Sequence, residues 1–266
     1  MKNKHRALLI CVTVLAVTVF VGLSIMITDK DDNEQNNALY AEDHPTIDDV
    51  MKSTGDYVRN NKSLFEEATN SLKTVRHPDN LVAAQIGDVS LTISELEFRK
   101  GLSAAGNPAK GTLHTVFNEL IEEKIILNEA VQKGLAPTTE EIEVFLAREL
   151  EESKTNPEYR ENIDKLIKSW SISEDEYWQK YEWYNAFRMI TIDKVYKDVI
   201  SEAEKTGKIP RIVSDDSASE VLKKQEAHES YWGQYTMKLK KEADIKVIDE
   251  FANELNVERD KWYLSE

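Results

Sequence analysis

Apolar residues along this chain recur mostly at helical spacing. Side chains such as Leu113, Phe117 and Leu120 repeat every three or four residues, which places them on one face of a helix. Gly55 interrupts the first of these stretches, so that stretch is either one broken helix or two short ones. Helices are expected over 47–75, 92–104, 113–131, 137–150, 157–167, 171–205 and 217–242.

Two short segments break the helical pattern and predict strands. Val82–Thr92 reads as a strand, a turn and a second strand, and its best partner is Ala243–Ile248 near the other end of the chain. A two-stranded ribbon alone is marginally stable. The distant segments are therefore expected to pair and to close the helical region between them into one unit.

The N-terminal residues predict a membrane anchor. Ala7–Ile27 is an uncharged apolar run, and as a helix it spans roughly 30 Å, the thickness of the hydrocarbon core. Cleavage as a signal peptide is the alternative, but no small-residue cleavage site follows the run closely. Lys2, Lys4 and Arg6 precede it, so a single-pass protein of the cell membrane is expected, with its N-terminus in the cytoplasm and its main domain outside.

The sequence predicts five segments along the chain. A membrane anchor over 1–28 is followed by an acidic, flexible tether over 29–46, a helical lead-in over 47–80 and the main domain over 81–248. The last segment, 249–266, is either an extra helix or a partner-binding tail.

Charge and motifs argue against several functions. With 34 basic and 49 acidic residues, the formal net charge is −15, which disfavours nucleic-acid binding. No glycine-rich loop for a nucleotide, no metal-ligand spacing and no catalytic motif is present, so no cofactor, metal or catalytic residue is expected. His228-Glu229 begins a zinc-protease pattern, but Trp232 occupies the position of the second histidine. The only cysteine, Cys11, lies within the apolar run.

Aromatic residues gather in two of the predicted helices. Six occur within eleven residues, so they cover more than one face of the helix. Most of them are expected in the core, and at least one face of the helix is expected to meet a second surface. Three more on the 217–242 helix are candidates for a facing wall, and together the two groups are proposed to bind extended apolar polypeptides. The candidate binding residues are Tyr177, Trp178, Tyr181, Trp183, Tyr184, Phe187, Tyr231, Trp232 and Tyr235.

The order of these elements resembles a known family. Val82–Leu96, followed by Val116–Ala130 and Gly134–Ile142, resembles the N-terminal chaperone domain of SurA- and PrsA-type foldases. Ser171–Tyr177 looks like the family's next helix start, and Ala243–Ile248 takes the place of its closing strand. The resemblance implies a mainly α fold: a multi-helix chaperone domain closed by a small two- or three-stranded β element and preceded here by one transmembrane helix.

The same resemblance guides the functional expectation. Family members often carry a parvulin prolyl isomerase domain before the last helix, but here only 206–216 is available, whereas a folded domain needs roughly fifty residues or more. The expected function is therefore to bind unfolded secreted or envelope polypeptides without catalysis. A divergent prolyl isomerase, or an adaptor for one dedicated envelope partner, remains open as an alternative.

Overall fold

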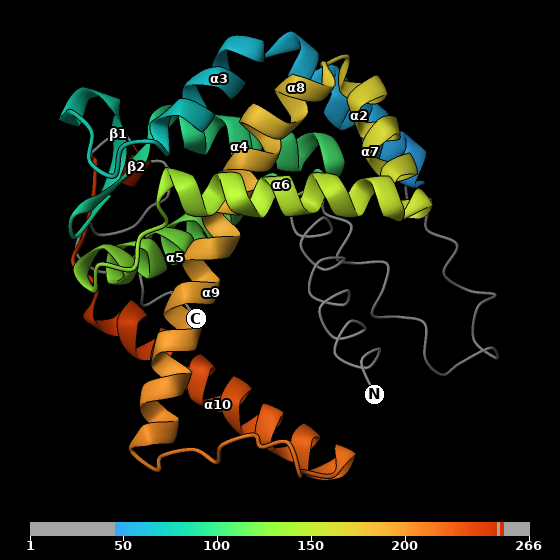
Figure 1. The fold of residues 1–266 in the computed structure, drawn as a ribbon. Helices are drawn as coiled ribbons and strands as arrows, with labels where there is room; N and C mark the ends of the chain where they lie inside the picture. The colour runs from blue at the N-terminus through green and yellow to red at the C-terminus, as the bar shows by residue number, and fades with distance from the viewer. Residues whose placement is uncertain (1–45, 249–250, 253–266) are drawn as a thin grey trace, which may run out of the picture. The chain divides into compact units, whose positions relative to one another are not determined.

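The protein is described by a computed structural model, which covers residues 46–248 and 251–252 (Figure 1). The anchor predicted over 1–28 and the tether predicted over 29–46, except for Thr46, lie outside the described residues, as does nearly all of the segment 249–266. Within the described ranges, no helix combines the length and the apolar character needed to cross a membrane. The fold is mainly helical with a small antiparallel sheet, as expected from the sequence.

The chain divides into two compact units, each built from separate stretches of sequence. Among the described residues, unit 1 comprises 46–71, 94–117 and 146–185, and unit 2 comprises 72–93, 118–145, 186–248 and 251–252. The predicted lead-in is helical and belongs mostly to unit 1, where its first helix packs along the helix at 157–170. The helices are α2 (Ile47–Asn60), α3 (Lys62–Ser71), α4 (Ile93–Gly106), α5 (Leu113–Gln132), α6 (Thr139–Thr155), α7 (Pro157–Trp170), α8 (Glu174–Glu176), α9 (Glu182–Lys205) and α10 (Ala218–Glu242).

The first helical stretch breaks at a different residue from the one predicted. The helix α2 ends at Asn60. The next residue, Asn61, leaves the helical region at φ −128° and ψ 38°, and α3 begins at Lys62. Gly55 instead lies inside α2, where an added Cβ would overlap the backbone oxygen of Ser169 on α7. The glycine therefore permits close approach of two helices, and its helix continues unbroken.

Three short strands form the sheet of unit 2. The strands β1 (Val82–Ile86) and β2 (Val89–Thr92) make a hairpin, and β3 (Ile245–Val247) pairs antiparallel with β1, which gives the order β2-β1-β3. Gly87 turns the hairpin with φ +53°, and its N–H donates to the Asp244 carbonyl at 2.9 Å. The predicted pairing of two segments that are distant in sequence is thus confirmed.

Local signals account for several helix ends. Asn156 caps α7 with Pro157 in its first turn, and Ser217 forms a capping box at the start of α10. Gly134, with φ +66°, follows the end of α5 as expected of a C-terminal glycine.

The longest predicted helix contains an irregularity that its sequence pattern did not predict. Ser173 caps α8, and the chain then passes through a π-helical segment, Tyr177–Tyr181, before α9 begins at Glu182. In this π turn the Glu182 N–H donates to the Tyr177 carbonyl, five residues back, instead of the carbonyl four residues back as in an α-helix.

Candidate functional site

The nine predicted binding residues are divided between the two units. Tyr177, Trp178, Tyr181 and Tyr184 are buried in unit 1, where Trp183 is partly exposed. In unit 2, Phe187 is buried, whereas the three aromatic residues of α10 are partly exposed. The structure therefore places all but Phe187 of the first predicted wall in a different unit from the second wall, and it buries five of the nine residues.

The aromatic residues of unit 1 pack on one another. The ring of Trp170 meets Tyr181 edge-on at a centroid distance of 4.7 Å, and Tyr177 meets Trp178 edge-on at 5.0 Å. Such contacts contribute about 0.5–1.5 kcal/mol each beyond the burial of area. These side chains hold the core of unit 1 together, which is the role expected for most of the six.

Unit 2 presents a smaller, partly exposed aromatic surface. Tyr196 on α9 meets Trp232 on α10 edge-on at 5.5 Å, and Trp232 stacks on Tyr235 at 6.1 Å and 19°. Trp232 and Tyr235 pack against the buried side chains of Ala130, Val195 and Val199, and Tyr196 packs against a neighbouring buried cluster of Ile200, Ala203 and Ile209. We call the four partly exposed residues Tyr196, Tyr231, Trp232 and Tyr235 the α9–α10 aromatic surface.

Tyr196 was not among the residues predicted from the sequence. It lies in the second half of a long helix whose first half is far richer in aromatic residues. A signal was present, because Val195 and Val199 mark a buried stripe of α9 and Tyr196 borders it. Pairing that stripe with the aromatic positions of α10 predicts the contact.

Charged groups border the aromatic surface. The Tyr235 hydroxyl donates to Glu129 Oε1 at 2.5 Å, and Lys133 Nζ lies 5.5 Å from the centre of the Tyr235 ring. Burial, followed by the bond to Glu129, raises the pKa of Tyr235 to about 12. Burial opposes protonation of Lys133, but hydrogen bonds to Asp198 and Glu129 outweigh it and raise the pKa of this lysine. The ammonium group therefore stays charged beside the ring, a favourable cation–π position.

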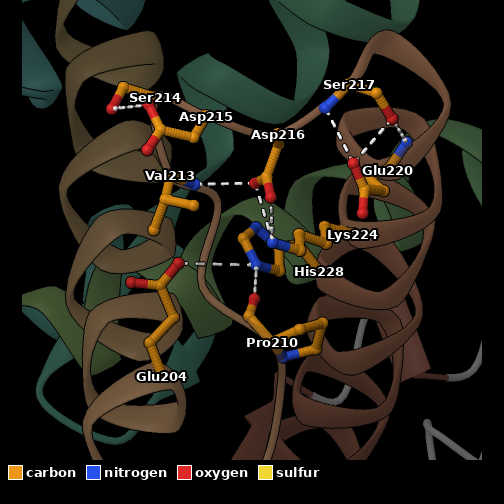
Figure 2. Close-up of polar contacts among 10 residues, drawn as sticks. All are labelled: Glu204, Pro210, Val213, Ser214, Asp215, Asp216, Ser217, Glu220, Lys224 and His228. Carbon is orange, nitrogen blue, oxygen red and sulfur yellow. Dashed lines mark hydrogen bonds and ion pairs between the residues drawn. The ribbon is translucent and has the colours of Figure 1, made fainter.

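A polar network fixes the connection between α9 and α10 (Figure 2). His228 Nε2 lies 2.8 Å from the Pro210 carbonyl oxygen and 3.5 Å from Glu204 Oε1. Lys224 Nζ donates to both carboxylate oxygens of Asp216 at 2.6 and 2.7 Å, and this contact lowers the pKa of Asp216. These contacts hold the connection against α10 at two points, Pro210 and Asp216.

The same network explains the histidine in the incomplete zinc-protease pattern. The His228 ring is buried and directed at the connection, so its role is structural. Within the part of the chain that the structure describes, no group of three or more His, Cys, Asp or Glu residues is placed to hold a metal ion.

Comparisons with protein-family models, with curated proteins and with solved structures found no match.

Proposed function

We propose that this protein is a membrane-anchored, extracytoplasmic chaperone-like protein that binds unfolded or extended polypeptides without catalysis. The α9–α10 aromatic surface of unit 2 is the proposed contact, in place of the larger set of aromatic residues expected from the sequence. The anchor is the apolar run 7–27.

The observation that carries this proposal is the partial exposure of a connected aromatic surface. Trp232 contacts both Tyr196 and Tyr235, and all three side chains are partly exposed. Stacking and burial of area on such rings tolerate many client sequences, because no fixed pattern of hydrogen-bond donors and acceptors is read. A polypeptide with exposed apolar side chains is therefore a suitable ligand.

The arrangement of strands and helices also supports this proposal. A hairpin before α4 and a single closing strand after α10 follow the order in the foldase family that the sequence resembles. The connection from Thr206 to Ser217 has twelve residues, far fewer than the roughly fifty that a folded isomerase domain requires. Binding without catalysis is consistent with this short connection.

The test uses the full chain in lipid nanodiscs. Aggregation of a chemically unfolded model protein is followed by light scattering, and isomerisation of a proline peptide is measured in parallel. We expect suppression of aggregation without isomerisation, and we expect the double variant Tyr196→Ala/Trp232→Ala to lose most of that suppression.

A matched variant controls for a general loss of apolar surface. Leu222→Ala/Met237→Ala removes two exposed apolar residues of α10, with exposed fractions of 61% and 57%, and should suppress aggregation as well as the parent chain does. Thermal melts check that both variants fold. If the parent chain does not suppress aggregation, or if a folded aromatic variant suppresses it fully, the proposed function or its proposed site is wrong.

A further inference from the structure

Unit 1 contains two buried carboxyl groups close to the π-helical segment. Glu149 on α6 and Glu182 at the start of α9 are 3% and 4% exposed. The Tyr159 hydroxyl donates to Glu149 Oε2 at 3.3 Å, and the Tyr177 hydroxyl donates to Glu182 Oε2 at 3.1 Å. Glu149 is thus bound by a tyrosine of α7, and Glu182 by a tyrosine of the adjoining π-helical segment.

Within the part of the chain that the structure describes, neither acid forms an ion pair with a buried cation. Glu149 Oε1 lies 3.6 Å from Nη2 of Arg148, whose side chain is 58% exposed. Glu152 on α6 adds a further negative charge, and Asn185 Nδ2 offers Glu182 only a long contact of 3.5 Å. Two ionised carboxylates in such a site repel each other and lack the water that normally solvates them.

Burial favours the protonated form of both acids. Burial, assisted by the charge of Glu149, raises the pKa of Glu182 to about 7. Burial, followed by the charge of Glu152, also raises the pKa of Glu149. Because the two acids interact, their protons are lost in steps that belong to the pair.

The π-helical segment depends directly on one of these acids. Tyr177 and Glu182 are joined twice, by the backbone bond that defines the π turn and by the bond between their side chains. Short π turns are rare and often occur at functional sites. A change in the charge of Glu182 therefore acts at the point where the helix departs from regular geometry.

We propose that Glu149 and Glu182 act together as a pH-sensitive pair: protonation of at least one of them keeps α6, α7 and the π-helical segment tightly packed, and ionisation of both loosens this packing. The sign follows from linkage. A carboxyl group that holds its proton more tightly in the folded state stabilises that state fully at low pH, and this contribution falls as the pH rises from about 4.5 to about 7. Unit 1 should consequently open more readily in neutral or alkaline solution.

Hydrogen exchange tests this proposal on the full chain in nanodiscs. Between about pH 5.5 and pH 8.5, and after correction for intrinsic exchange, protection of amides in 146–185 should fall at least about tenfold. The Glu182→Gln variant keeps the size of the side chain but cannot ionise there, so the protection of its amides in 146–185 should vary far less with pH. Glu149→Gln should have a similar effect, which keeps the test decisive if one variant folds poorly.

Glu151→Gln supplies the matched control. Glu151 is also on α6, but its side chain is 70% exposed, so this variant should retain the pH dependence of the parent chain. A parent chain whose protection in 146–185 is independent of pH would overturn the proposal. So would Glu182→Gln and Glu149→Gln variants that both retain the full pH dependence.

Discussion

Two glycines within helices show how the environment of one residue determines its contribution. Gly55 lies within α2 and Gly233 within α10. A glycine inside a helix destabilises it by about 0.5–1 kcal/mol relative to alanine. An added Cβ at Gly55 would overlap the Ser169 backbone, whereas at Gly233 nothing lies within 4 Å. Only the first glycine is required by packing.

Alanine substitutions at these two positions should therefore have opposite effects. We expect Gly55→Ala to destabilise the protein by about 1–3 kcal/mol, because the backbone of α7 must move to admit the methyl group. Gly233→Ala should stabilise it by about 0.5–1 kcal/mol. Urea denaturation of the two variants measures both changes, and equal shifts of the same sign would contradict the packing argument.

At the scale of elements, the strand β3 provides a test of the sheet. Ile245 is 4% exposed, whereas the side chain of Lys246 at the neighbouring position is 70% exposed, as alternation along a strand requires. Replacing Ile245 by alanine should cost about 2–5 kcal/mol, since it empties part of the core. Lys246→Ala should change stability by less than about 0.5 kcal/mol. Thermal denaturation compares the two, and a larger loss from Lys246→Ala would show that the strand faces the other way.

Elements set by local chemistry could be predicted from the sequence. The start of α10 was predictable because Ser217 and Glu220 cap each other within four residues, and β1 and β3 were predictable because both are apolar strands in a helical chain. The break after Asn60 and the role of Gly55 were not, because that role depends on Ser169, far along the chain.

The candidate site was less predictable than the elements, for a similar reason. Spacing shows that Tyr177, Trp178 and Tyr181 cover more than one helix face, but it does not show that a π turn and neighbouring helices bury all three. Trp232, by contrast, was predicted to line a binding surface and is partly exposed. Its aromatic partner on α9 is Tyr196, and not one of the six aromatic residues at 177–187 that it was predicted to face. Burial depends on tertiary partners, and spacing alone does not identify them.

For the whole molecule, the sheet links segments separated by most of the chain. Strand β1 begins at Val82 and its partner β3 ends at Val247, with α4 to α10 between them. Without β3, the sheet becomes a two-stranded hairpin, which is marginally stable in water. The stability of the β1–β2 hairpin is therefore expected to depend on β3, more than 150 residues further along the chain.

Truncation tests this dependence. A chain ending at Glu242 lacks β3, and we expect amides of Val82–Thr92 to lose most of their protection from hydrogen exchange. A chain ending at Ala252 retains β3 together with the buried Phe251 and Ala252, so its hairpin should remain protected. Because both truncated chains lack the residues after 252, the difference between them isolates the contribution of residues 243–252, which include β3. If the hairpin stays protected without β3, then other contacts hold it, such as the 2.9 Å bond from the Asp88 N–H to Asn128 Oδ1 on α5 and the 2.8 Å bond from the Ser90 N–H to the Val75 carbonyl, and the sheet does not close the unit.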